Sequence, residues 1–462
     1  MVAAGLSCGA VPAIAETLNE ALAAAYNYNP KLDAQRAALR ATDEEVAKAM
    51  SGFRPRIEAN GETSWQNTNT RPDSLAEGKT YPKAYSVDAV QPIFTGLQTV
   101  YGVRGAEATV RAGREQLRAV EQEVLLDAVI AFADVVRDQA IVQERENNVV
   151  VLSKELKATQ DRFAVGEVTK TDVAQAQARR AGAVSALDQA RANLKSRRAA
   201  FEQVIGHPPA ALREPSGFDR ILPKSLDEAV AVAVNENPAV VGALYDEEAA
   251  RHAVDRIRGE LLPEVQVEAS YQDRFDSDRL SDEREVATVT GRVRVPIYEG
   301  GEVHARVRQA KQQHIEKLQR IEQARSEVQA QVTSAWSQLL GVRAKIDSDR
   351  VQVEANQTAL AGVREEERVG QRTLLDVLDA ELELLNSQVQ LSQTRRDLVV
   401  AAYSLVQSMG RLEVAQLGVA DPVYDPEIHY HEVRRKWWGI TVTDEEGRTV
   451  VVPPPAGYAP AK

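Results

Sequence analysis

The chain has 462 residues and a net charge of -12, from 56 lysines and arginines against 68 aspartates and glutamates. This balance argues against a nucleic-acid-binding protein, which would need a clustered basic surface. Aromatic residues make up only 5% of a chain rich in Ala, Val, Leu, Gln, Glu and Arg, a composition typical of long helices, and no apolar run is long enough to predict a transmembrane helix.

Residues 1–15 are predicted to be a secretory signal peptide. They are small and apolar and end in an A-x-A cleavage pattern, although a basic residue near the start is missing. Cys8, the only cysteine, lies inside this segment. Its lipidation is an alternative, but the three residues before it match a lipidation sequence poorly. Cleavage would leave a mature protein without thiols, which suits an oxidising envelope compartment.

The rest of the chain contains one half-protein twice. Residues 17–61 align without a gap to 225–269, and the likeness resumes downstream, where 91–96 match 295–300 and 164–176 match 368–380. Such a period is too long for a solenoid unit. The sequence therefore predicts repeat 1 at 16–206, an inter-repeat linker at 207–224, repeat 2 at 225–415 and a C-terminal tail at 416–462.

Each repeat has the same predicted order of elements: a helix, two strands, a long helix and a return helix. In repeat 1 we expect a helix at 17–50, strands at 54–66 and 82–94, a long helix at 97–161 and a return helix at 168–205. In repeat 2 we expect a helix at 225–258, strands at 262–273 and 285–298, a long helix at 301–366 and a return helix at 373–410. Capping boxes begin both opening helices.

The strands alternate apolar and polar side chains, most clearly where Val265, Val267, Ala269 and Tyr271 interleave with polar residues. One interpretation is a soluble antiparallel sheet with a wet side. Charges on the polar side, in a chain that offers no second sheet to pack against, favour a membrane β-barrel instead. Four strands cannot close a barrel in lipid, so the chain is expected to oligomerise.

The long helices are predicted to form coiled coils. Neither contains a proline, and at 1.5 Å per residue each would be a rod of about 95–100 Å. Their small apolar residues recur with a heptad period, which predicts left-handed supercoiling. The shorter helices, stacked end to end in pairs, would match one rod in length and complete a helical wall.

Together these features resemble the TolC family of outer-membrane channel-tunnel proteins, over roughly residues 17–415. The resemblance rests on the duplication, on the pairs Asn29-Pro30 and Asn237-Pro238, on QPIFTG and VPIYEGG after the second strands, and on VG-x-x-T-x-x-D at both hairpin tips. It implies a homotrimer with a 12-stranded β-barrel, four strands from each chain, in the lipid of the Gram-negative outer membrane, continuous with a periplasmic α-helical coiled-coil barrel.

The resemblance also implies a function and partners. The family forms passive exit ducts that work with a periplasmic adaptor (membrane fusion protein) and an inner-membrane ABC or RND transporter. The motif VPIYEGG and the proline-rich tail slightly favour type I protein secretion. The alternatives are multidrug or small-molecule efflux and a non-conducting coiled-coil scaffold. The tail is expected to stay periplasmic.

The hairpin tips hold the predicted site residues. Asp172 and Asp376 each follow a threonine at capping-box spacing, and capping alone would account for both. Capping does not account for Asp379, which faces Gln175 in the repeat alignment. The resemblance implies that Asp376 and Asp379 ring a closed periplasmic mouth as a pore constriction, and solvated capping is the alternative.

The resemblance further implies gating contacts at the positions of Asp172 and Arg372, helped by a tyrosine hydroxyl. Glu367 stands at that tyrosine position, and its carboxylate cannot bond well to an ionised Asp172. Arg368 and Arg372 are therefore expected to replace the missing hydroxyl, because an Arg fork fits a carboxylate.

No enzyme, cofactor or metal is expected. The sequence contains no P-loop, dinucleotide fingerprint or nucleophile elbow. His429 and His431 in the tail lack further ligands at suitable spacing and are interpreted as surface residues. A hairpin around Glu446 and Gly447 is a possibility that the tail sequence leaves open.

Overall fold

The computed structural model describes residues 16–69, 78–278, 281–419, 422–443 and 448–450. The predicted signal peptide with Cys8, and the tip of the hairpin predicted around Glu446, lie outside these residues. The chain divides into two compact units, each of which draws on both repeats. We call 1–36, 116–241 and 324–423 the helical unit, and 37–115, 242–323 and 424–462 the sheet unit.

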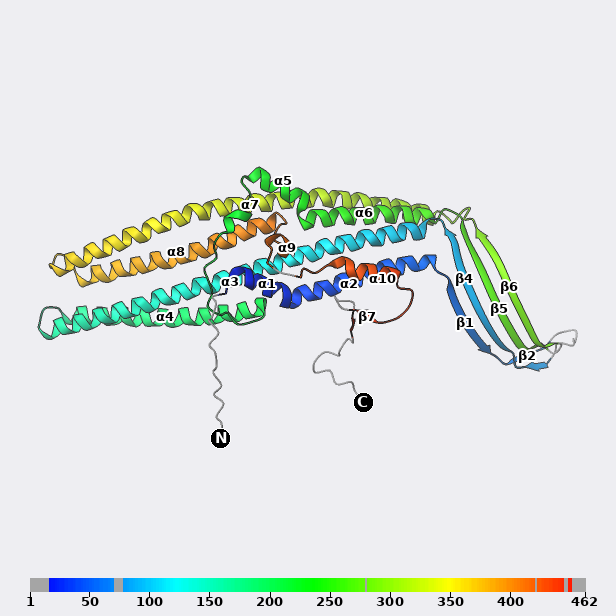
Figure 1. Ribbon diagram of the computed structural model, residues 1–462, viewed down its shortest axis with the longest axis horizontal. Coiled ribbons are helices and arrows are strands. Elements are labelled where there is room, and N and C mark those ends of the chain that lie inside the picture. Colours follow the sequence, from blue (N-terminus) through cyan, green and yellow to red (C-terminus); the bar gives the residue numbers. More distant parts are fainter. Residues whose placement is uncertain (1–15, 70–77, 279–280, 420–421, 444–447, 451–462) are drawn as a thin grey trace, which may run out of the picture. The chain divides into compact units, whose positions relative to one another are not determined.

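Helices make up most of the fold (Figure 1). Repeat 1 contains α1 (Leu18–Tyr28), α2 (Pro30–Met50), α3 (Gln98–Ala164) and α4 (Lys170–Ile205). Repeat 2 contains α5 (Leu226–Glu236), α6 (Pro238–Gly259), α7 (Glu302–Arg368) and α8 (Leu374–Ser408). Two shorter helices, α9 (Val414–Leu417) and α10 (Pro426–Arg435), follow, and the 3-10 turns are η1 (Ser51–Phe53) and η2 (Phe218–Ile221). Among the described residues, no helix combines the length and apolarity that a membrane crossing needs.

The opening helix of each repeat is broken, so the predictions of single helices at 17–50 and 225–258 are wrong. A residue that precedes proline is disfavoured in the α conformation, and Asn29 and Asn237 are both extended. At each break the asparagine side chain forms a hydrogen bond to the backbone of another helix. Asn29 donates to the carbonyl of Val204 at 2.9 Å, and Asn237 donates to that of Ser408 at 2.8 Å. Each break therefore ties an opening helix to the end of its own return helix.

The sheet unit contains one four-stranded antiparallel sheet in the order β1-β4-β5-β6 (Figure 1). Its strands are β1 (Arg56–Thr63), β4 (Lys83–Thr95), β5 (Glu264–Asp278) and β6 (Ser281–Arg294). Strands of the two repeats meet at its centre, where β4 pairs with β5. Two small hairpins pair β2 (Gln66–Thr68) with β3 (Gly78–Thr80) and β7 (Val442–Thr443) with β8 (Thr449–Val450).

The register separates the sheet into an apolar and a polar side. One row across all four strands contains Ile57, Ala89, Ala269 and Val289, and the next row contains Glu58, Asp88, Ser270 and Thr288. The apolar side is open to solvent in the single chain: the exposed fractions of Ile57, Val289 and Val293 are 68%, 78% and 63%. The polar side is linked by hydrogen bonds, among them Arg292 to Glu268 at 2.8 Å and Asn60 to Asp88 at 3.2 Å.

In the core of the helical unit, small and aliphatic side chains pack around two aromatic rings. Phe132 of α3 and Phe201 of α4 are fully buried, with ring centroids 6.3 Å apart. The heptad positions predicted on the long helices are largely buried, including Leu117 and Val124 on α3. The coiled-coil period in the sequence thus corresponds to the packed side of each rod.

The tail adds a helix to the sheet unit. His429 of α10 is 7% exposed and its Nδ1 lies 2.9 Å from a carboxylate oxygen of Asp43, which is 1% exposed. The expectation that His429 is a surface residue is therefore wrong, because the buried carboxylate gives it a partner that the sequence did not reveal. His431, two residues on, is exposed as expected.

Candidate functional site at the hairpin tips

Two helical hairpins, α3–α4 and α7–α8, end in turns of the same construction. A glycine with positive φ, Gly166 at 85° and Gly370 at 78°, turns the chain at each tip. A threonine then caps the return helix. Thr169 donates its backbone N–H to Asp172 at 2.8 Å, and Thr373 donates to Asp376 at 2.9 Å.

These caps fix the charge state of two predicted site residues. The hydrogen bonds from Thr169 hold the pKa of Asp172 below its usual value, and those from Thr373 do the same for the pKa of Asp376. Both aspartates are partly exposed. Each is therefore an ionised group at a helix N-terminus, and the pore role of Asp376 remains a prediction.

The other predicted site residues pair with partners that the sequence did not indicate. Asp379 accepts a hydrogen bond from Arg179 of α4. Arg372 lies 3.0 Å from Glu366 and Arg368 lies 2.6 Å from Glu365, so both arginines are engaged by their own turn. Glu367 pairs with Arg162 of α3 at 2.8 Å. Within the described residues, no ion pair joins two of the six predicted residues, and their gating role also remains a prediction.

Two of these contacts connect one hairpin with the other. Arg162 and Glu367 join α3 to α7, and Arg179 and Asp379 join α4 to α8. The hydrogen bond from Arg162 to Glu367 raises the pKa of Arg162 further above its usual value. A small buried cluster lies beside these pairs and consists of Leu152, Ala176, Leu374 and Leu378.

Arg162 and Arg179 could have been found in the sequence. In the repeat alignment they correspond to Glu366 and Glu383, so the charge is reversed between otherwise similar halves. Opposite charges on neighbouring hairpins attract each other. The actual partners, Glu367 and Asp379, lie one residue after Glu366 and four residues before Glu383, so the reversal does not by itself identify the pairs.

A half-buried carboxylate lies next to these pairs. Desolvation raises the pKa of Glu155 on α3, and the neighbouring charges of Glu381 and Glu367 raise it further. Glu381 is 5% exposed and pairs with Arg364 at 2.7 Å. Three carboxylates and two arginines therefore share the space between the hairpins.

A cavity of about 520 Å³ opens beside the same pairs. Its apolar lining comes mainly from α4 and α8, including Ala183, Ala186, Leu378, Leu382 and Leu385. Leu382 is 40% exposed, so the cavity is a groove with an accessible apolar wall.

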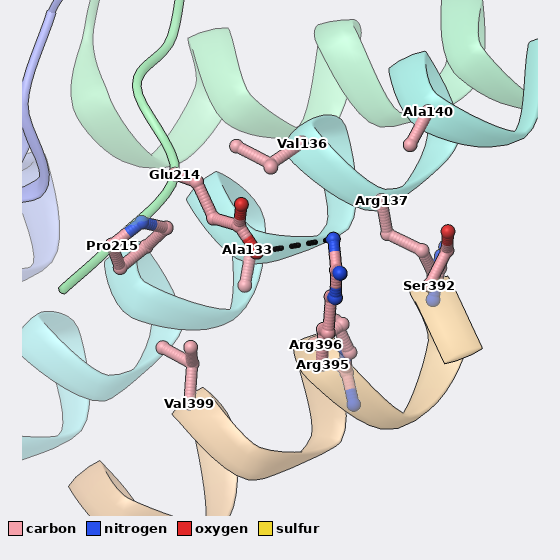
Figure 2. A pocket seen from close by; sticks show the side chains of 10 residues that line it. All are labelled: Ala133, Val136, Arg137, Ala140, Glu214, Pro215, Ser392, Arg395, Arg396 and Val399. Atoms are coloured by element: carbon pink, nitrogen blue, oxygen red, sulfur yellow. Dashed lines mark ion pairs between the residues drawn. The ribbon is translucent and has the colours of Figure 1, made fainter. Parts of the chain in front are cut away.

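A second cavity, of about 90 Å³, lies where the inter-repeat linker crosses α3 and α8 (Figure 2). Arg395 reaches Glu214 of the linker at 3.8 Å, as the dashed line in Figure 2 marks. Behind it, Asp134 is 4% exposed and pairs with Arg396 at 2.7 Å and with Arg137 at 3.2 Å. Arg396 and Arg137 thus compensate a buried charge, which would be costly to leave unpaired.

Comparisons with known proteins agree with this architecture. The family model for outer membrane efflux proteins matches residues 21–207 and 230–411. The outer membrane efflux protein BepC of Brucella suis is 38% identical, over 94% of this chain and 93% of its own length. The alkaline protease secretion protein AprF of Pseudomonas aeruginosa is 25% identical, over 77% of this chain and 76% of its own.

The fold is also that of a solved outer-membrane channel. The crystal structure of CmeC from Campylobacter jejuni superposes with a TM-score of 0.76, covering 90% of this chain and 89% of that one, at 14% identity. The predicted resemblance to the TolC family is confirmed. The chain belongs to the outer membrane efflux protein family, whose members are channels of the Gram-negative outer membrane rather than enzymes.

Proposed function

We propose that three copies of the chain form the passive exit duct of a tripartite export system. An inner-membrane transporter and a periplasmic adaptor would deliver the cargo, and the duct would carry it through the outer membrane. The observation that carries this proposal is the two-sided sheet, with its exposed apolar side and its hydrogen-bonded polar side.

The sheet explains why one copy alone is not enough. β1 and β6 are the outer strands of the sheet and pair with one neighbour each. An open edge in lipid would leave backbone N–H and C=O groups unpaired. Pairing β1 of one copy with β6 of the next removes both edges, and three four-stranded sheets give the predicted 12-stranded barrel. The polar side then lines the lumen, and the apolar side contacts lipid.

A matched pair of substitutions tests the orientation of the sheet. Val289→Arg places a charge on the apolar side, where it should cost about 2–4 kcal/mol near the middle of the bilayer. Thr288→Arg places the same charge on the polar side, one residue away. We expect the first variant to lose channel activity in planar bilayers and the second to keep it. Equal conductance of both would contradict the barrel and favour the non-conducting scaffold.

The cargo class is supported by relatives of two kinds. The name of AprF supports type I protein secretion, the class that the sequence favoured. BepC, an efflux protein by name, is more similar and matches over more of the chain, which supports small-molecule efflux as the second candidate.

Deletion of the gene separates these candidates. A protein-secretion duct predicts the loss of one or a few proteins from the culture medium with unchanged resistance to dyes and antibiotics. An efflux duct predicts the opposite, and complementation with the wild-type chain is the control. A strain that keeps both its secreted proteins and its resistance would count against export as the function.

A further inference from the structure

The C-terminal tail is fixed to the sheet unit along a defined path. Glu427 at the start of α10 pairs with Arg114, and Arg434 at its end pairs with Glu107 at 3.0 Å. Between them the ring of Tyr430 lies against the guanidinium groups of both arginines, at 5.2 and 5.8 Å. Because α3 begins at residue 98, these contacts show that α10 runs towards the end of α3 that adjoins the sheet.

The path leads to the short segment just before the first strand. Arg54 follows η1 and lies two residues before β1. Its Nη1 donates to the carbonyl of Lys436 at 2.9 Å, and its guanidinium lies 4.8 Å from the ring centre of Trp437. The tail after α10 is therefore held at the start of β1.

All four strands adjoin helices at this end of the sheet. The register pairs Arg56 with Val90, Thr95 with Glu264, and Glu264 with Arg294, so β1 and β5 begin here while β4 and β6 end here. If the sheet crosses the membrane, as we propose above, this end lies at the periplasmic boundary of the bilayer.

The side chains gathered there are apolar and exposed. Trp438 is 89% exposed and Ile440 100%, and Trp437 is 68% exposed despite its contact with Arg54. At the same end of the sheet, but after the opposite edge strand β6, Ile297 and Tyr298 are 95% and 83% exposed. Monomeric proteins rarely leave such groups together in water, so the patch indicates a binding surface.

Its composition fits a lipid headgroup region. Tryptophan and tyrosine are enriched at membrane interfaces because their rings are apolar and their N–H or O–H groups can stay hydrated. The two tryptophans directly follow the basic run Arg434-Arg435-Lys436, and basic residues beside aromatic ones are typical of segments that lie on membrane surfaces.

We propose that residues 434–440, which we call the tail anchor, bind the periplasmic leaflet of the outer membrane. Trp437, Trp438 and Ile440 insert among the phospholipid headgroups, and Arg435 faces the lipid phosphates. Arg54 is a positioning residue that fixes the anchor at the level where the strands enter the bilayer. This proposal rests on the proposed membrane-crossing sheet and adds a second, non-strand contact with lipid.

Depth-dependent fluorescence quenching tests the anchor in the full chain. The four tryptophans are Trp65, Trp336, Trp437 and Trp438. A variant with Trp65→Phe and Trp336→Phe reports only on the anchor, and one with Trp437→Phe and Trp438→Phe is its matched control. Both would be reconstituted into phosphatidylethanolamine and phosphatidylglycerol vesicles that carry a quencher either near the headgroup or deep in the acyl chains.

We expect the headgroup-level quencher to act on the anchor tryptophans more strongly than the deep quencher does. Arg54→Ala should weaken this quenching, since a cation–π contact of this kind corresponds to a factor of about two to five in docking. Arg56→Ala, an exposed arginine two residues away, should leave it unchanged.

Channel conductance of the same vesicles separates the possible outcomes. Conductance without lipid quenching of the anchor tryptophans overturns the anchor alone. If their emission is then also blue-shifted, a second copy of the chain covers the patch instead. Vesicles with neither conductance nor quenching would overturn the membrane-crossing sheet and the anchor together.

Discussion

At the scale of single residues, the tips show which charges are free to act on a passing ion. Asp379 is compensated by Arg179, whereas Asp376 is bound only within its own cap. If the tips form the narrow mouth of the duct, Asp376 contributes an ionised carboxylate there, with the charge of Arg372 nearby.

Neutralising this mouth should change ion selectivity. We expect Asp376→Asn with Asp379→Asn to lower the preference for cations and weaken block by multivalent cations, because rings of acidic side chains select cations. Reversal potentials in salt gradients measure this. Asp172→Asn is the matched control, since Asp172 holds the equivalent position in the cap of the other hairpin, and Thr169 remains as the N-cap residue. Selectivity unchanged by the double substitution would return both aspartates to a purely structural role.

The contacts between hairpins give a second prediction. Arg162→Glu should raise single-channel conductance, because it places two carboxylates together where Arg162 and Glu367 now attract each other. Each partly exposed pair contributes about 0–1 kcal/mol, and three copies of it add up in a symmetric ring. The charge swap Arg162→Glu with Glu367→Arg should restore the wild-type level. Arg372→Glu, at a contact within one turn, should have the smaller effect, and the reverse ranking would support the lock first expected from the sequence.

Glu121 gives a prediction of how the stability of the fold depends on pH. Burial raises the pKa of Glu121 to about 7, well above its ordinary value, although the backbone N–H of Val414 donates to it at 2.8 Å. Between the ordinary pKa and about 7 the folded protein keeps a proton that the unfolded chain has released. Stability must therefore fall as the pH rises through this window. Thermal melting across it should show the fall in the wild type and a flatter profile in Glu121→Gln.

At the scale of elements, the sequence repeat and the alternation of apolar and polar residues predicted most of the architecture. Heptads predicted the rods and period-two patterns predicted the strands, because both patterns follow directly from side-chain geometry. β5 and β6 nevertheless extend towards their shared loop beyond the predicted ends at 273 and 285. Arg274 pairs with Arg284 and Phe275 with Glu283, in a mostly charged stretch where no apolar side marks the strand.

The charge reversal at Arg162 and Arg179 is visible in the sequence, but the ion pair that each arginine forms is not, for a related reason. An ion pair between Arg179 and Asp379 depends on which helices lie side by side, and a helix period shows only which side of one helix is buried. The buried pair of His429 and Asp43 was missed in the same way, since the two residues come from distant parts of the chain.

The broken opening helices give a prediction at this scale. Asn237→Ala removes the hydrogen bond to Ser408 and the one that Ala239 donates to the asparagine side chain, and it leaves a partly buried carbonyl unpaired. We expect a loss of about 1–3 kcal/mol in stability, measured by chemical denaturation. Asn235→Ala, an exposed asparagine on the same helix, should change stability far less. Equal effects would mean that proline alone sets the break.

At the scale of the whole molecule, the proposed barrel is stable only when several chains assemble. Four strands leave two open edges, so the detergent-extracted protein should be an obligate trimer with both helix and strand in its circular dichroism. Light scattering or native mass spectrometry measures the stoichiometry. A folded monomer that persists on dilution in detergent would contradict the closed barrel.

The two ion pairs between the hairpins depend on a difference between the repeats. Arg162 pairs with Glu367 and Arg179 with Asp379, and the repeat 1 positions that match these two carboxylates hold Phe163 and Gln175. A ring in which both hairpins had the sequence of repeat 1 would therefore lack both pairs. Charge attraction between adjacent hairpins is thus a property of the fused chain with two unlike halves, and neither half carries it alone.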